Sequence, residues 1–236
     1  MVDVMGIALI EHLTQNSKES IITHSTLEEN GSLPLDYLFR DFSQMPKLEK
    51  HALTLCKGAV LDIGCGAGSH ALYLQNKGLK VTALDKSKGA IEVCEKRGLQ
   101  STICTNILDY SEEKFDTLLL LMNGIGIAGS LEQLPNYLNH FRTLLQPNGQ
   151  ILLDSSNIIY MFDADEDGGY WIPGDTDYYG EVKFTMEYKT YKSDTFPWLY
   201  IDFETLERVA LYCGFACEKI MEGEHYDYLA KLSLLA

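Results

Sequence analysis

Two acidic residues and a glycine loop have the types and spacing that suit a ligand containing a nucleoside. Asp62 precedes the loop Gly64-Cys65-Gly66-Ala67-Gly68, and Asp85 ends the next apolar segment. Glycines let a backbone approach a ligand closely. A carboxylate at the end of the second strand can accept hydrogen bonds from ribose hydroxyls. These residues therefore predict a nucleoside site at the carboxyl edge of a parallel sheet.

The spacing of the glycines separates two classes of ligand. Dinucleotide-binding proteins use G-x-G-x-x-G and place a pyrophosphate at a helix N-terminus, whereas here Gly68 comes one residue early. Asp62 is unfavourable beside a pyrophosphate but suits an α-amino group. The pattern therefore favours S-adenosylmethionine. Asp85 fits either ligand, and an NAD(P)-binding oxidoreductase remains the alternative.

The segments around these residues alternate between strands and helices. Glycines that follow apolar-periodic runs, such as Gly78, predict where helices end. From residue 59 to residue 155 this alternation predicts an α/β fold with a parallel, doubly wound sheet. The expected strands are residues 59–63, 80–84, 100–105, 116–121 and 150–155, and the expected helices are 69–77, 87–97 and 131–145.

The pattern changes after residue 155. Residues 181–190 and 195–201 predict an antiparallel β-hairpin, and residues 215–221 and 226–233 are joined too tightly for any but an antiparallel pair. We expect one domain over residues 1–236, in four parts. These are a helical N-terminal cap (1–57), a cofactor-binding core (58–155), an insertion or lid with the hairpin (156–201), and a closing helix with antiparallel strands (202–236).

Residues 60–91, VLDIGCGAGSHALYLQNKGLKVTALDKSKGAI, resemble the class I S-adenosylmethionine-dependent methyltransferases. The pair Phe115-Asp116 before an apolar strand, the segment LLQPNGQILL (144–153) and the antiparallel finish support this resemblance. It implies a Rossmann-like fold whose seven-stranded, mostly parallel sheet has an antiparallel last strand. It also implies in-line transfer of a methyl group to an acceptor. A noncatalytic S-adenosylmethionine-binding module would carry the same motif.

The resemblance also implies a set of cofactor-binding residues. Asn106 departs from the family pattern, since many members have an acid there, but an amide oxygen can still accept from an adenine amino group. Cys65 is interpreted as a small residue in a tight turn rather than as a nucleophile. The implied residues are Asp62, Gly64, Cys65, Gly66, Gly68, Asp85, Lys86, Asn106, Ile107, Met122 and Asn123.

The acceptor is harder to infer, because a base is needed only for an acceptor that is protonated at the working pH. Met122-Asn123-Gly124 stands where enzymes that methylate nucleobase amino groups have an NPPY-like or DPPY-like motif. This favours a small-molecule acceptor, with an amine among the candidates. No catalytic residue is assigned; His70, Tyr37 and Arg40 are candidates, and packing or capping is the alternative role for each.

Residues 156–180 interleave acids with aromatic residues, a combination that can hold an ammonium group. We expect Asn157, Tyr170, Trp171 and Tyr178 to contact a substrate under a lid. The alternative is a solvated loop whose aromatic residues pack on the sheet or at a dimer contact. The acids are Asp163, Asp165, Glu166, Asp167, Asp175 and Asp177.

Composition limits the partners. The formal net charge of −15, from 34 acids against 19 bases, disfavours a duplex nucleic acid. No apolar run approaches a membrane span, and residues 1–10 lack the basic start of a signal peptide, so we expect a cytoplasmic protein. The six cysteines show neither CxxC nor zinc spacing, so no metal is expected. Monomer and homodimer both stay open.

Overall fold

A seven-stranded sheet forms the centre of the computed structural model, which describes residues 2–28, 30–163, 165, 169–172 and 176–235. Its strand order is β11-β12-β7-β6-β3-β4-β5. The strands from β7 to β5 pair in parallel, while β12 runs antiparallel to both β7 and β11. The predicted mostly parallel sheet with an antiparallel last strand is confirmed. The bounds are β3 (Ala59–Ile63), β4 (Lys80–Asp85), β5 (Thr102–Cys104), β6 (Phe115–Leu120), β7 (Leu145–Ser156), β11 (Phe215–Glu222) and β12 (Asp227–Leu234).

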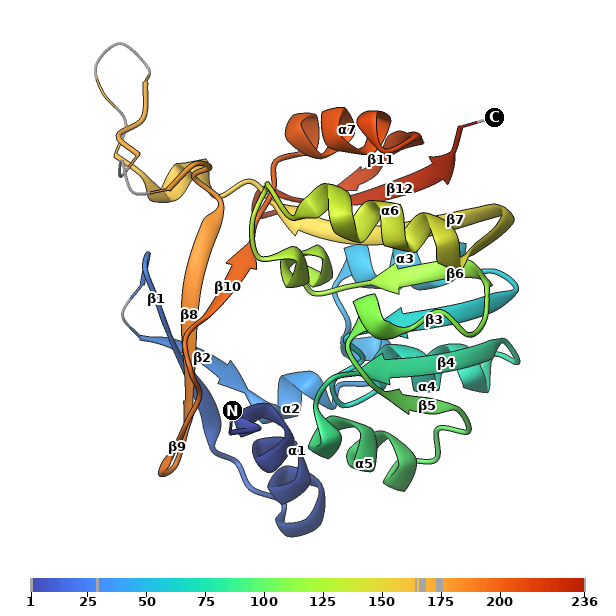
Figure 1. Ribbon diagram of the computed structural model, residues 1–236. Helices are drawn as coiled ribbons and strands as arrows, with labels where there is room; N and C mark the ends of the chain where they lie inside the picture. Colours follow the sequence, from blue (N-terminus) through green and yellow to red (C-terminus); the bar gives the residue numbers. More distant parts are fainter. Residues whose placement is uncertain (1, 29, 164, 166–168, 173–175, 236) are drawn as a thin grey trace.

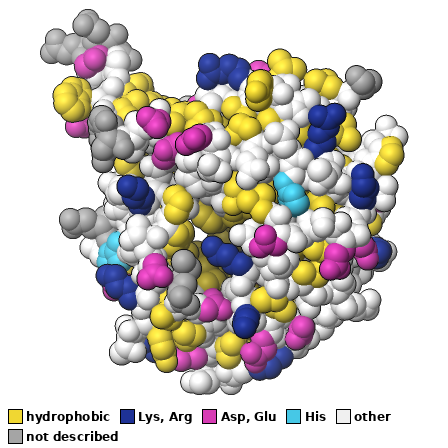
Figure 2. Space-filling view, in the orientation of Figure 1, with side chains coloured by type: hydrophobic (Ala, Val, Ile, Leu, Met, Phe, Trp, Pro, Cys, Tyr) yellow, Lys and Arg dark blue, Asp and Glu magenta, His cyan; other side chains and the backbone are white. Residues whose placement is uncertain are grey.

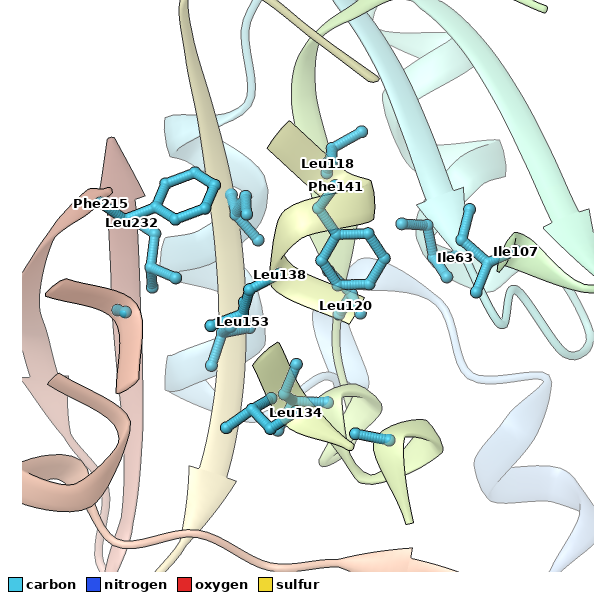
Figure 3. Packing of buried hydrophobic residues seen from close by; sticks show 14 of the residues in the cluster. Ile63, Ile107, Leu118, Leu120, Leu134, Leu138, Phe141, Leu153, Phe215 and Leu232 are labelled. Atoms are coloured by element: carbon cyan, nitrogen blue, oxygen red, sulfur yellow. The ribbon is translucent and has the colours of Figure 1, made fainter. Parts of the chain in front are cut away.

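Helices cover both faces of this sheet. The side chains of β6 point alternately to the two faces of the sheet, and because its run of leucines presents apolar side chains to both, both faces must be covered. Leu119 of β6 packs with residues of α3 and α4, whereas Leu118 and Leu120 pack with Leu138 and Phe141 of α6. Figure 3 shows the second of these clusters. The helices are α3 (Lys47–Leu55), α4 (Ser69–Asn76), α5 (Lys88–Lys96), α6 (Leu134–Leu144) and α7 (Phe203–Tyr212).

A second sheet combines the N-terminal segment with the insertion. Its order is β10-β8-β1-β2, all antiparallel, and β9 pairs with β8. Figure 1 shows this second sheet facing the ends toward which β3, β4 and β6 point. We call those strand ends, with the ends of β5 and β7, the carboxyl edge. The second sheet consists of β1 (Ser20–Ser25), β2 (Gly31–Pro34), β8 (Glu181–Tyr188), β9 (Tyr191–Lys192) and β10 (Phe196–Leu199).

The second sheet confirms the predicted hairpin and corrects the description of the N-terminal cap. Helices α1 (Val4–Gln15) and α2 (Leu35–Leu38) are present, but β1 and β2 lie between them and the cap is not wholly helical. In β1 only Ile21 is fully buried while the next residue, Ile22, is exposed, so the strand lacks a clear apolar alternation. Residues 20–23 pair with the neighbouring β2 and residues 22–25 pair with β8, which is remote in sequence, so the two pairings together make this segment a strand.

Helix α1 ties the second sheet to the core beside the end of β4. Asp3 caps α1 through Gly6 N–H and also accepts hydrogen bonds from Ser87 Oγ at 2.8 Å and Gly89 N at 3.1 Å. Gly89 must lack a side chain, because a Cβ there would lie 2.5 Å from the Cα of Gly6. Tyr188 of β8 packs in the same buried cluster as α1 and α5. The second sheet is thereby fixed in front of the carboxyl edge.

Candidate active site

The glycine loop presents bare backbone at the carboxyl edge. Gly64, Gly66 and Gly68 all have positive φ, at 74°, 53° and 79°, a region that favours glycine. A Cβ built on Gly64 or Gly66 would meet nothing within 4 Å, whereas one on Gly68 would lie 2.8 Å from Cys94 Sγ. The first two glycines therefore leave open space for a ligand, and the third permits the loop to pack on α5.

Asp85 is oriented by the same loop. Its Oδ2 accepts a hydrogen bond from Gly66 N at 3.0 Å, and its Oδ1 accepts one from Ser87 N at 2.8 Å. Burial raises the pKa of this carboxyl, and these two backbone donors oppose the rise. The side chain stays partly exposed. The two backbone donors thus fix the Asp85 carboxylate at the end of β4, where it can accept hydrogen bonds from ribose hydroxyls.

Asp62 has an oxygen without a partner. The side chain is 2% exposed, and the Ala71 N–H hydrogen-bonds to the carboxylate, yet Oδ2 has no hydrogen-bond partner in the described part of the chain. Burial raises its pKa to about 6, opposed by the charge of His70. A buried polar atom without a partner costs free energy. A ligand ammonium group would supply the missing donor.

The ends of β4 and β5 bring the next predicted residues together. Asp85 pairs in register with Cys104, so Lys86 and Asn106 follow from neighbouring strands. Both are exposed, while Ile107 is buried. Asn106 uses its side-chain oxygen to accept from Leu108 N at 3.0 Å. The amide predicted to bind adenine therefore already caps a short helix, η2 (Ile107–Asp109).

Met122 and Asn123, which follow β6, adopt a backbone conformation rare for residues other than glycine. Their φ values are 62° and 54°. Asn123 N donates to Asp154 Oδ1 at 3.0 Å, Asn123 Nδ2 donates to Leu199 O at 3.2 Å, and Ser155 Oγ donates to Asn123 Oδ1 at 2.6 Å. Such strained turns persist where the surroundings hold them and are common at functional sites. Asn123 thus joins β6, β7 and β10.

The three candidate catalytic residues meet around a carboxylate, Glu49 of α3. Arg40 Nη2 donates to both Glu49 oxygens, His70 Nε2 lies 2.9 Å from Glu49 Oε2, and the Arg40 guanidinium lies 3.8 Å from the centre of the Tyr37 ring. Burial would raise the pKa of Glu49, but the hydrogen bonds and charges of His70 and Arg40 outweigh it and hold the pKa below its usual value.

Glu49 was missed in the sequence, although a signal was available. Within the N-terminal cap expected to be helical, Glu49 stands three and four residues before Ala52 and Leu53. Residues at that spacing share a helix face, and both are buried. The periodicity alone therefore puts a carboxylate on the buried face, where it requires partners.

Asp154 of β7 completes this group. In register, Asp62 lies opposite Leu119 and Leu119 lies opposite Leu152, so Asp154, two residues after Leu152, points to the same face as Asp62. Helices α3 and α4 cover that face. The charges of Glu49 and Asp154 both act on the Tyr37 hydroxyl, whose pKa is raised mainly by burial. We call Tyr37, Arg40, Glu49, His70 and Asp154 the acid–base cluster.

The first part of the insertion carries two exposed aromatic residues. Tyr170 and Trp171 are 45% and 78% exposed, and Figure 1 shows the described residues between η4 (Ile159–Met161) and β8 projecting away from the two sheets. Contact of Tyr170 and Trp171 with a substrate stays a prediction. The predicted acids Glu166, Asp167 and Asp175 lie outside the described residues.

Asn157 and Tyr178 make contacts inside the protein. Tyr178 Oη donates to Asp202 Oδ2 at 2.6 Å and accepts from Asp202 N at 3.0 Å. Tyr179 Oη donates to Asn157 Oδ1 at 2.9 Å. Because Asp202 also caps α7, these residues anchor the insertion to α7. Contact with a substrate stays a prediction for both.

Two negative observations concern only the residues that the structure describes. Among them, no helix has the length and apolar character needed to cross a bilayer. No group of three or more His, Cys, Asp or Glu side chains in these ranges is placed to hold a metal ion.

Comparison with known proteins agrees with the fold and the glycine loop. A model of the methyltransferase domain matches residues 60–149. The crystal structure of an S-adenosylmethionine-dependent methyltransferase from Bacteroides fragilis, in complex with S-adenosyl-L-homocysteine, has a TM-score of 0.92 and 42% sequence identity. That similarity covers 99% of this chain and 95% of the other.

More distant relatives share less of their length. The ubiquinone biosynthesis O-methyltransferase of Rickettsia conorii is 24% identical over 78% of this chain, and the chain spans 65% of that enzyme. For the Rickettsia felis enzyme of the same name the span falls to 46%. The CcbJ methyltransferase of Streptomyces caelestis, 14% identical with a TM-score of 0.64, shares the fold.

Proposed function

The chain belongs to the class I S-adenosylmethionine-dependent methyltransferases, and from this premise we propose that it methylates a small molecule held between the two sheets. The observation that carries the family is the similarity along the whole chain to the S-adenosylhomocysteine-bound enzyme. The position of the second sheet before the carboxyl edge supports the proposed place of the acceptor.

The residues present fit the cofactor. Asp62 would accept from the α-ammonium group, which supplies a partner for its free Oδ2. The open backbone at Gly64 and Gly66 would lie against the methionine and ribose portions. Asp85 would accept from the ribose hydroxyls, and Ile107 would pack on the adenine. Lys86, Asn106, Met122 and Asn123 remain proposed contacts at the ends of β4 to β6.

The chemistry divides between cofactor and protein. When bound, the cofactor supplies a methyl carbon on a sulfonium, so that the carbon–sulfur bond breaks with its electron pair left on sulfur as the acceptor's lone pair bonds to the carbon. The protein aligns the acceptor, excludes water and receives any proton that the acceptor must lose. The acid–base cluster supplies groups for that last task.

A small acceptor suits the space that the fold leaves. Figure 2 shows the surface hollowed between the second sheet and the core, with hydrophobic side chains inside and charged ones at the margin. Trp198 of β10 closes on the turn after β6, since a Cβ on Gly126 would lie 2.1 Å from its Nε1. The curated relatives include enzymes named for oxygen methylation and for methylation of a peptide N-terminus. Their names therefore leave the acceptor atom open.

Calorimetric titration with S-adenosylhomocysteine and with NADH, followed by a screen for transfer of a radiolabelled methyl group to small metabolites, tests the proposal. We expect binding of S-adenosylhomocysteine alone and labelling of a small acceptor. Binding of NADH alone would identify the oxidoreductase alternative. Binding without labelling of any acceptor across a broad panel would favour a noncatalytic module.

A further inference from the structure

We propose that Asp154 forms an ammonium-binding subsite and accepts the proton of an amine, so that the acceptor class is an amine bound as its ammonium ion. This inference rests on the proposed function, because it concerns the acceptor side of the same site. It starts from the position of the carboxylate and from the groups that surround it.

Asp154 uses only one of its two carboxylate oxygens in a hydrogen bond with another described residue. Its Oδ1 accepts from Asn123 N, in the strained turn after β6. Within the described residues, no side chain donates a hydrogen bond to its Oδ2, and the residue keeps partial exposure although its neighbours Leu153 and Ser155 are buried. One oxygen is therefore fixed by the turn, and the other keeps the capacity to accept a hydrogen bond from a ligand.

Asp154 interacts electrostatically with groups on four other elements. Glu49 of α3 and His70 of α4 act on its charge, and its own charge acts on Tyr37 of α2 and on Tyr228 of β12. Arg40 already gives its guanidinium to both oxygens of Glu49. Among the described residues no Lys or Arg forms an ion pair with Asp154, and a ligand ammonium group is the chemistry that would complete the cluster.

The same surroundings suit proton transfer. Burial above all, with the charge of Glu49, raises the pKa of Asp154 to about 7. Desolvation also lowers the pKa of a bound ammonium group, so the two values approach each other. In the step, an N–H bond breaks, its electron pair stays on nitrogen, and the proton bonds to Oδ2, giving a neutral amine and a neutral carboxyl group. The amine then has the lone pair that methyl transfer needs.

A hydroxyl acceptor would fit this cluster less well. A neutral hydroxyl brings no positive charge, so the repulsion between the carboxylates of Asp154 and Glu49 would persist after it binds. An ammonium ion removes that repulsion on binding and again when its proton passes to Asp154. The electrostatics therefore favour nitrogen over oxygen as the methylated atom.

Sinefungin tests the subsite without a known acceptor. This S-adenosylhomocysteine analogue carries a C–NH3+ group where the cofactor carries its methyl sulfonium, so it places an ammonium at the reacting position. At pH 8 we expect calorimetry to show that the wild-type protein binds sinefungin about tenfold more tightly than S-adenosylhomocysteine, close to 1.4 kcal/mol. The Asp154→Asn variant should lose this preference and keep its affinity for S-adenosylhomocysteine.

Controls separate the possible outcomes. Asp194→Asn, an exposed acid in the segment between β9 and β10, should leave the ratio of affinities unchanged. Lowering the pH from 8 to 6 should reduce the wild-type preference as Asp154 is protonated, and should reduce it much less in Asp154→Asn. This second measurement applies even if the variant binds both ligands weakly. An equal ratio in wild type and Asp154→Asn would overturn the inference, as would a wild-type ratio near one.

The acceptor screen gives an independent outcome. Labelling of amines, with a large loss of kcat in Asp154→Asn, would support the inference. Labelling of hydroxyl compounds alone would overturn it while leaving the methyltransferase proposal intact. Failure of the wild type to bind S-adenosylhomocysteine and sinefungin alike would instead overturn the proposed function.

Discussion

The two sides of the site are built in different ways. The proposed cofactor side centres on one contiguous stretch, β3 to β4, in which the loop glycines and both carboxylates lie within residues 59–85. The proposed acceptor side comes from remote segments: β1 and β2, the loop and helix carrying Arg40 and Glu49, the end of β7, and the hairpin β8–β10. Residues that lie close together in the sequence can be recognised by their spacing. Residues that come from remote segments meet only through long-range pairing, which the sequence does not display.

The largest effect should come from disturbing the contiguous side, through Gly68→Ala. A Cβ at φ 79° is strained, and here it would also lie 2.8 Å from Cys94 Sγ. We expect the free energy of unfolding, measured in urea, to fall by about 3 kcal/mol.

Gly78→Ala is the matched control for this change. Gly78 has a φ of 87°, but nothing lies within 4 Å of a built Cβ. Its loss should be only about 1 kcal/mol. Equal losses in the two variants would show that the contact between the loop and α5 contributes nothing.

On the proposed cofactor side, Asp62→Asn should change the affinity for the cofactor product and the stability of the protein in opposite directions. The amide keeps the shape but loses the charge that would pair with the α-ammonium group of the cofactor. We expect about a 30-fold weaker affinity for S-adenosylhomocysteine, near 2 kcal/mol, by calorimetry. An unchanged affinity would contradict the proposed role of Asp62.

Although Asp62→Asn should weaken ligand binding, it should raise the free energy of unfolding of the ligand-free protein at neutral and higher pH. The folded-state pKa of Asp62 is raised from 3.8 to about 6, so the native state binds more protons than the unfolded chain between these values. Stability from this group is therefore present at low pH and is lost as the pH rises toward about 6. Urea unfolding should show Asp62→Asn equal to wild type near pH 4 and more stable by about 2 kcal/mol at pH 8.

This contrast explains what could be predicted from the sequence. Asp62, Gly64, Gly66, Gly68 and Asp85 follow local rules of glycine conformation and strand ends, so their placement was predictable. The catalytic candidates His70, Tyr37 and Arg40 were identified one at a time. What joins them is Glu49, which interacts with all three across segments that no short-range pattern connects.

The N-terminal strands of the second sheet, β1 and β2, escaped prediction for a similar reason. Residues 20–25 have a single fully buried side chain, so no apolar alternation marks them as a strand, and part of their pairing is with β8, more than 150 residues later. Tyr170 and Trp171 show the opposite case. Their composition suggested a ligand, but composition does not specify where a loop points.

Where the insertion is anchored to α7, Tyr178→Phe should have a moderate effect on stability. It removes a hydroxyl that both donates to and accepts from Asp202, the cap of α7. We expect the free energy of unfolding to fall by about 1 to 2 kcal/mol, with unchanged affinity for S-adenosylhomocysteine. Tyr160→Phe is the matched control, because the Tyr160 ring stacks on Tyr226 and its side chain is half exposed. A similar loss in the control would contradict the anchoring role.

The smallest effect should come from the projecting segment, through Tyr170→Ala and Trp171→Ala. Exposed side chains away from the carboxyl edge contribute little to folding, so the free energy of unfolding should stay within about 0.5 kcal/mol of wild type. The affinity for S-adenosylhomocysteine and the rate of methyl transfer, once an acceptor is known, should also be unchanged. If either variant raised the KM for the acceptor several-fold, the segment would fold over the site during turnover. The acceptor side would then include part of the insertion that this conformation leaves outside it.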